Sequence, residues 1–186
     1  MCPYIDFFDG NILQLRMTQG QIVDTLNFKA IPLSEKWKEL IRKNPHLKHY
    51  NALSDEDLIS IGVPVYKQLG RCMDSGIDRN IIGDFFVRMG KDRQEKGFPI
   101  SESVYACNLS QEMIIDYMVS ENINDNPLAI YQTLEIVNQI NKFYFLGLFY
   151  MIKGYLEKTY THMSTKHGVS ENTLKECFND DFFFKK

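Results

Sequence analysis

The feature that most constrains the fold is a helical pattern that runs without interruption from about residue 128 to about residue 162. At about 1.5 Å per residue, such a helix would be about 50 Å long, longer than a small domain is wide. Along it, mainly apolar residues repeat with the alternating spacing of four and three that is typical of a coiled-coil seam. The seam contains Ile130, Leu134, Val137, Asn141, Tyr144, Leu148, Met151 and Tyr155.

Two further rows make this helix apolar on every side around its middle. The second row, beside the seam, contains Ile136, Ile140, Phe143, Gly147, Tyr150 and Gly154. The third row covers the remaining side with Phe145, Phe149, Ile152 and Leu156. A helix that is apolar all round must be buried all round, and one small domain covers about two of its faces. The pattern therefore predicts that a second copy of the chain covers the one face that the domain leaves open.

We expect the two copies to pair along the seam and the glycine row, because Gly147 and Gly154 allow two backbones to approach closely. The predicted dimer interface contains Asn141, Tyr144, Gly147, Leu148, Met151, Gly154 and Tyr155. Two roles stay open for Asn141. A single buried polar residue in a seam can fix the register of a dimer, and the same side chain can instead face the gap between helices.

The rest of the chain also predicts helices. Pro32 marks the start of a helix that carries Trp37 on its inner face. Ser54 is a suitable N-cap for the next helix, which Pro64 is expected to kink or to split after Gly62. No strand pattern of comparable strength is present. The predicted fold class is therefore all-α, a single-domain helical bundle, globin-like or of four to five helices, with a long C-terminal dimerisation helix.

A sharp corner is expected near residue 97. A basic helix end precedes Gly97, which suits the left-handed position after a helix. Phe98 and Pro99 follow, and Ser101 and Glu102 are typical of the first turn of a new helix. We interpret this stretch as a helix stop followed by a helix start, and not as a catalytic loop or a phosphate cradle.

Charge and hydropathy argue against several classes of protein. The chain has 21 Lys and Arg residues against 24 Asp and Glu, a net charge of −3, so it does not resemble an electrostatic nucleic-acid binder. Its most apolar run, residues 143–152, is about half of the roughly twenty residues that a membrane span needs. The four cysteines are far apart and form no CxxC pair, as in reduced cytosolic proteins. We expect a soluble, cytoplasmic protein.

No arrangement of residues predicts catalysis, a metal or a cofactor. His46 and His49 form an H-x-x-H pair, but no cysteine or carboxylate constellation completes a zinc site. Cys107 falls on an apolar stripe, where a packed thiol is the expectation. Glu112 and Asp116 are four residues apart, as on a solvated helix face. The expectation is a protein that is not an enzyme.

From about residue 31 to about residue 161, the chain resembles the N-terminal domain of the RsbT co-antagonist (RsbR/RsbRD) family of bacterial signalling regulators. The resemblance rests on "LSEKWKELIRKNP", "LSDEDLISIGVPVYKQLGRCMDSG", "FFVRMGKDRQEKGFPISESVYACNLSQEMIIDYM" and "VNQINKFYFLGLFYMIKGYLE". It implies an all-helical sensing module of stress-response signalling that pairs with itself through its last helix. Such a module passes a change of state to a partner protein or output domain. The family shares no single ligand, so no binding residue carries over.

Two functions stay open at this point. The first is a non-enzymatic, dimeric regulatory domain in which a signal shifts the relative pose of two long helices. The alternative is a protein that binds a small molecule or cofactor, such as haem, another tetrapyrrole or a lipid, in an aromatic interior. The residues proposed for that pocket are Phe85, Phe86, Met113, Tyr117, Phe145 and Phe149. Because interiors are normally close-packed, we favour the first function. The predicted division is an N-terminal extension (1–30), the helical domain (31–162) and a C-terminal extension (163–186).

Overall fold

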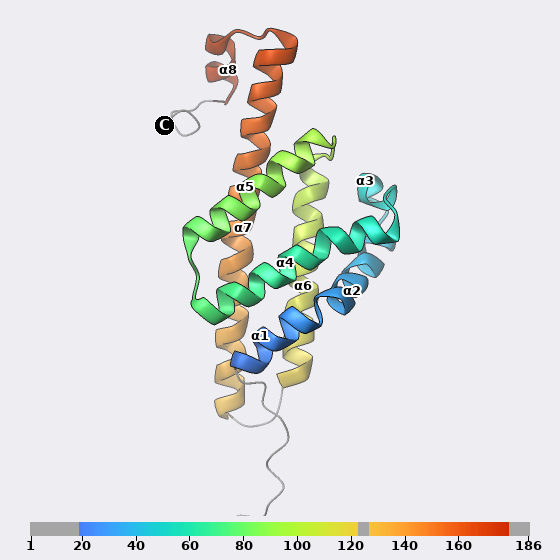
Figure 1. The fold of residues 1–186 in the computed structure, drawn as a ribbon, viewed down its shortest axis with the longest axis vertical. Coiled ribbons are helices and arrows are strands. Elements are labelled where there is room, and N and C mark those ends of the chain that lie inside the picture. Colours follow the sequence, from blue (N-terminus) through green and yellow to red (C-terminus); the bar gives the residue numbers. More distant parts are fainter. Residues whose placement is uncertain (1–18, 123–126, 179–186) are drawn as a thin grey trace, which may run out of the picture.

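The computed structural model describes residues 19–122 and 127–178, and all of the regular secondary structure in these ranges is helical (Figure 1). The predicted all-α bundle is therefore confirmed. In chain order the helices are α1 (Gln19–Phe28), α2 (Ala30–Arg42), α3 (Lys48–Asn51), α4 (Asp55–Ser75), α5 (Arg79–Glu95), α6 (Ile100–Asn122), α7 (Pro127–His167) and α8 (Glu171–Phe178).

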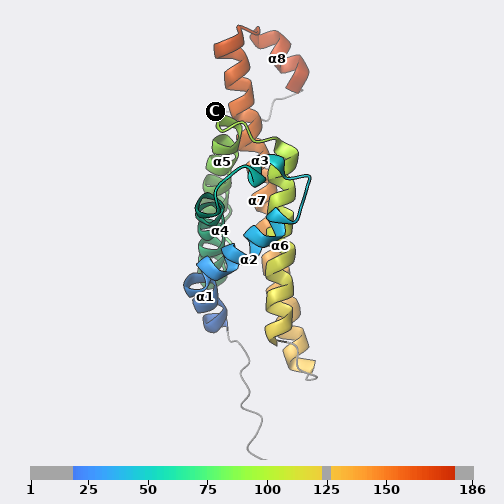
Figure 2. The same ribbon diagram turned by 90° about the vertical axis from the view of Figure 1, so that its right-hand side faces the viewer.

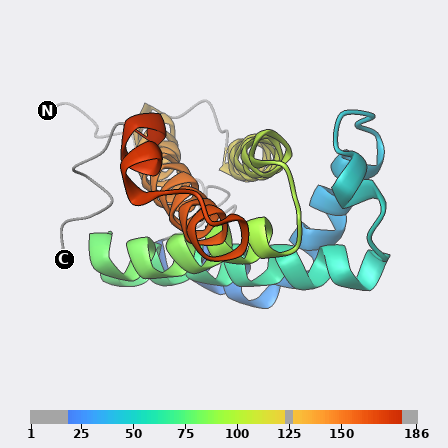
Figure 3. The same ribbon diagram turned by 90° about the horizontal axis from the view of Figure 1, so that it is seen from above.

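The helices form two layers (Figure 2, Figure 3). One layer is the pair α6 and α7, which lie side by side and run in opposite directions (Figure 1). The other layer contains α1, α2, α4 and α5, with α5 packed extensively on α7 and α2 packed on α4. With 41 residues, α7 is the longest helix, and its C-terminal part extends beyond the bundle to where α8 turns back beside it (Figure 1).

The local signals for helix ends are confirmed. The Ser54 side chain caps α4 by accepting a hydrogen bond from the backbone N–H of Asp57 at 3.1 Å. Gly97 has a φ of 78°, and the N–H of Phe98 donates to the carbonyl of Arg93 at 2.9 Å, which closes α5 before α6 begins at Ile100. The corner is thus a helix stop followed by a helix start.

Of the two effects expected from Pro64, a kink or a split, the split is wrong, because α4 continues from Asp55 to Ser75 with Pro64 inside it. Gly62, just before the proline, packs so closely on α2 that a Cβ at this position would lie 2.7 Å from the Ser34 hydroxyl. Packing on one neighbouring helix therefore holds the two halves of α4 together despite the hydrogen bond that the proline removes.

Part of the segment predicted as an N-terminal extension contributes to the core. Ile22 and Leu26 on α1 are fully buried, and α1 packs on α4. At the other end, Leu174 on α8 is also fully buried. Among the described helices, none combines the length and hydropathy needed to cross a lipid bilayer.

Candidate functional site

The glycine row of α7 packs against α5 inside the chain. A Cβ at Gly147 would lie 2.5 Å from the ring of Phe86, and one at Gly154 would collide with the carbonyl of Val87. The contact is reciprocal, because a Cβ at Gly90 on α5 would collide with the carbonyl of Met151. The close backbone approach predicted from the glycines therefore exists, but the neighbour is α5 of the same chain.

The seam is used inside the chain as well. Tyr144 and Met151 are almost completely buried. The Tyr155 hydroxyl donates to the carbonyl of Phe98 at 3.0 Å, which joins α7 to the corner before α6. Leu148 is half-buried, and exposed Asn141 accepts a hydrogen bond from Gln111 on α6 at 2.9 Å.

These contacts change the face on which a partner could lie. Of the seven residues predicted for a dimer interface, the five that pack within the chain are Tyr144, Gly147, Met151, Gly154 and Tyr155. Four of these five residues are buried within the chain, and Tyr155 is partly buried. Periodicity shows that a face is covered, and it cannot distinguish a neighbouring helix of the same chain from a second copy.

The third row faces away from α5 and α6. Phe145 is 75% exposed and Phe149 is 47% exposed, whereas Ile152 and Leu156 are partly buried. We call these four residues the outer row of α7. Towards the N-terminal end of the helix, Leu134 on the same side is 62% exposed. Phe145 and Phe149 are one helical turn apart and both expose a large apolar ring, and exposed apolar surface of this kind marks sites that bind a partner.

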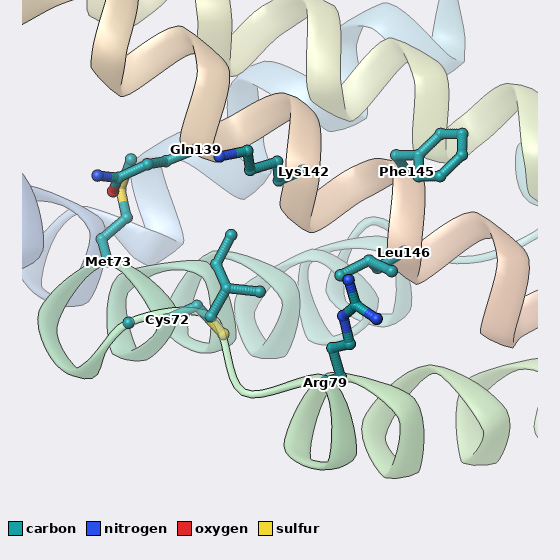
Figure 4. A pocket seen from close by; sticks show the side chains of 9 residues that line it. Cys72, Met73, Arg79, Gln139, Lys142, Phe145 and Leu146 are labelled. Carbon is teal, nitrogen blue, oxygen red and sulfur yellow. The ribbon is translucent and has the colours of Figure 1, made fainter.

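A cavity of about 540 Å³ lies beside the outer row, where the corner between α4 and α5 meets α7 (Figure 4). Its lining consists of Cys72, Met73, Gly76, Ile77, Arg79, Gln139, Lys142, Phe145 and Leu146. Apolar side chains of both layers form much of the wall. The cations of Arg79 on α5 and Lys142 on α7 add positive charge, which suits a ligand that combines an apolar body with an anionic group.

The aromatic pocket predicted from the sequence is close-packed at most of its positions. Phe86 is completely buried in edge-to-face contact with Phe85 and with Phe143, at centroid distances of 5.1 and 5.3 Å. Met113 is buried, and the Tyr117 hydroxyl accepts a hydrogen bond from Lys29 at 3.0 Å.

Of the six predicted pocket residues, the cavity includes Phe145 alone. The residues that sequence reasoning missed there include Met73, Arg79 and Lys142. The available signal was the turn between α4 and α5, with Gly76 at a φ of 84°.

A buried cluster of hydroxyls ties α4, α6 and α7 together. The Ser110 hydroxyl lies 3.0 Å from the hydroxyl of Tyr66 and 2.7 Å from that of Tyr144. Burial raises the pKa of both tyrosines, so both stay neutral. These bonds satisfy polar groups that would otherwise destabilise the core.

The nucleophile and metal candidates have structural contacts. The Cys107 thiol lies 3.8 Å from the sulfur of Met151, and burial raises its pKa to about 11, so the reactive thiolate is disfavoured. The His49 ring lies 2.8 Å from the nearly buried carboxylate of Glu102. Within the described ranges, no three His, Cys, Asp or Glu side chains are grouped to hold a metal ion.

Comparison with known proteins assigns this fold to a family. Residues 19–157, about three quarters of the chain, match the family described as the histidine kinase N-terminal domain. Neither the curated proteins nor the solved structures gave a match. The match extends from α1 into α7 and includes the cavity and the outer row. The chain therefore belongs to the histidine kinase N-terminal family, whose members are helical sensory domains of bacterial signalling.

Proposed function

We propose that the protein is a non-enzymatic regulatory domain that works as a homodimer and relays a signal through its α7 helices. Membership of the histidine kinase N-terminal family supports a sensory role in two-component signalling. The resemblance to RsbT co-antagonists adds that the recipient is a protein partner or an output domain of a stress-response pathway. The observation that carries the dimer is the exposure of the outer row, with Phe145 75% exposed.

The exposed side of α7 has the spacing that self-pairing needs. Residues on this side repeat at alternating intervals of four and three: Leu134, Asn138, Asn141, Phe145, Leu148 and Ile152. That heptad register lets the same helix of a second copy pack along it. With α6 beside each α7, two copies would form a four-helix arrangement around a shared core. The predicted seam is thereby replaced by one that lies on the opposite side of the helix from α5.

A change at the cavity can reach the pairing surface without leaving α7. Lys142, Phe145 and Leu146 line the cavity, and Phe145 also belongs to the outer row. A ligand that prefers one pose of α7 shifts the population of paired states by its difference in affinity between them. The C-terminal part of α7 extends beyond the bundle, where a recipient can detect its position.

Sedimentation equilibrium of the full chain tests the dimer. Exposed phenylalanine contributes about 1.5–3 kcal/mol when it is buried, so Phe145→Asp removes at least about 3 kcal/mol from two copies and weakens pairing at least about a hundredfold. Phe28→Asp is the matched control, because Phe28 is 83% exposed on α1 in the other layer. Equal association of the two variants would refute the proposed interface.

Binding of a small molecule is the second candidate function, and the cavity is the observation that favours it. Its volume of about 540 Å³ is in the range of ligand sites, and Arg79 and Lys142 suit an anionic group. Native mass spectrometry and an absorption spectrum of the purified chain would detect a ligand that copurifies. Replacement of Leu146 by Trp should fill the cavity and displace that ligand. If this variant carried the same amount of ligand as the parent, the ligand would bind elsewhere in the protein.

A further inference from the structure

We propose that residues 179–184, with the sequence NDDFFF, pack along the outer row of α7 and restrain its pairing with a second copy. The contacts between α7 and α8 are the evidence for the docking of this segment. Its regulatory consequence rests on the proposed function, because it requires that α7 pairs.

The first observation is where α8 lies. Gly168, with a φ of 64°, reverses the chain after α7, and the N–H of Val169 donates to the carbonyl of Met163 at 3.2 Å. From there α8 packs on α7 with Leu174 fully buried. It lies on the side of α7 that faces away from the layer of α4 and α5 (Figure 2, Figure 3).

The second observation is that α8 covers the side of α7 on which the outer row lies, beyond the C-terminal end of that row. The ring of Phe178, the last residue of α8, meets the ring of Tyr160 edge-to-face at 6.0 Å. Tyr160 follows Phe149 by 11 residues, about three helical turns, and therefore lies on the same side of α7. The contacts of the returning chain move from Met163 back to Tyr160, towards the outer row.

The length of the segment fits the distance. From Tyr160 to Phe149 the helix rises about 16 Å, at about 1.5 Å per residue. Six residues in extended conformation span about 20 Å. A segment of this length that starts at Phe178 is therefore long enough to bring residues 182–184 to Ile152 and Phe149.

The chemistry of the segment matches this surface. Three consecutive phenylalanines, Phe182 to Phe184, follow the acidic pair Asp180 and Asp181. The apolar rings match the apolar outer row. Lys153, next to Ile152 in the sequence, places a cation at the edge of the outer row, where it attracts the acidic pair. Burial of three phenylalanine rings against the outer row removes apolar surface from water, which favours docking.

Docking of the segment and pairing of α7 then compete for one surface. The outer row that a second copy must contact is available only when the segment has left it. The apparent dissociation constant of the dimer rises as the fraction of chains with a free outer row falls. The segment is in this way an autoinhibitory contact, and an event that removes it favours the paired state.

Disulfide trapping in dilute full-length protein tests the docking. In a background with Cys2→Ser and Cys177→Ser, we expect Phe149→Cys with Phe183→Cys to form an intramolecular disulfide on mild oxidation, identified by peptide mapping. Phe28→Cys with Phe183→Cys is the control, since Phe28 is 83% exposed on the opposite layer. Equal yields for the two pairs would overturn the docking. A disulfide between two copies through Phe149→Cys alone, with no intramolecular product in the double variant, would also overturn it, because a second copy would then occupy the surface.

Sedimentation of the full chain with Phe182, Phe183 and Phe184 all replaced by Ser tests the regulation. We expect dimerisation to tighten by about tenfold, which corresponds to a segment that occupies the outer row in about two chains of three, because both copies of a dimer need a free outer row. An unchanged dissociation constant would overturn the regulatory step. If the trapped disulfide forms while both proteins stay monomeric, the docking is supported and the proposed pairing is the part that fails.

Discussion

Replacement of Gly90 by Ala should destabilise the packing of α5 on α7, which is the most extensive contact in the bundle. A Cβ at this position would collide with the carbonyl of Met151 and would lie 2.8 Å from the amide nitrogen of Tyr155. Both are backbone atoms of a helix, so they cannot move aside as the end of a side chain can. The two helices must therefore move apart along their line of contact.

The magnitude follows from two opposing effects. Overpacking that shifts a backbone costs about 1–3 kcal/mol. Alanine in place of glycine within a helix returns up to about 1 kcal/mol. Because the collision is with backbone on both sides of the contact, we take the upper part of the first range. The expected net loss in free energy of unfolding is about 2 kcal/mol.

Urea denaturation followed by far-UV circular dichroism measures this loss. Gly83→Ala is the matched control, since Gly83 lies one heptad earlier on α5 and a Cβ there would lie 3.2 Å from the ring of Tyr150, which is a side chain. That variant should stay within about 1 kcal/mol of the parent. If Gly90→Ala proved as stable as the parent with an unchanged m-value, the close approach of α5 and α7 would be refuted.

Three further predictions concern the core and the thiols. Ser110→Ala leaves the hydroxyls of Tyr66 and Tyr144 without their shared partner, and should lower the free energy of unfolding, measured by urea denaturation, by about 1–3 kcal/mol. Thr161→Ala, which removes an exposed hydroxyl on α7, is the control, and a smaller loss for Ser110→Ala than for this control would contradict the role of the cluster. Exposed Cys177 should react with iodoacetamide at neutral pH much faster than Cys107, whose pKa is raised to about 11, and equal rates measured by mass spectrometry would be the contrary result. The same raised pKa means that the folded chain holds the Cys107 proton more tightly than the unfolded chain. The contribution of Cys107 to stability is therefore complete below about pH 9 and is lost as the pH rises towards 11. Cys107→Ala should reduce the loss of stability between these pH values, and an undiminished loss would show that other groups cause it.

Local signals in the sequence were enough to place several helix ends. Ser54 caps α4 through an atom three residues away, and Gly97 closes α5 through bonds within five residues. Interactions of this range depend only on neighbouring residues, so their patterns can be recognised in any context. Pro64 shows the limit, because contact with Ser34 on another helix overrides its local preference.

The apolar surface of α7 was predictable, but the partners of its faces were not. The seam and the glycine row indicated two covered faces, and the structure covers them with α5 and α6. One clue was available, since Gly83 and Gly90 on α5 have the same spacing of seven as Gly147 and Gly154. Matching glycine spacings permit two helices to approach closely along one line, as α5 and α7 do here. The cavity could not be predicted, because two stretches of chain that are about 60 residues apart in the sequence form it only after folding.

Cysteine cross-linking along α7 tests the central claim most directly, namely that its outer row is the face open to a second copy. Two single variants are compared in the Cys2→Ser and Cys177→Ser background: Phe145→Cys on the exposed face and Ile140→Cys, which is fully buried on the face towards the bundle. On oxidation at a concentration that favours association, Phe145→Cys should form a covalent dimer and Ile140→Cys should remain a monomer. A covalent dimer of Ile140→Cys with none of Phe145→Cys would show that the face buried here is the one that pairs.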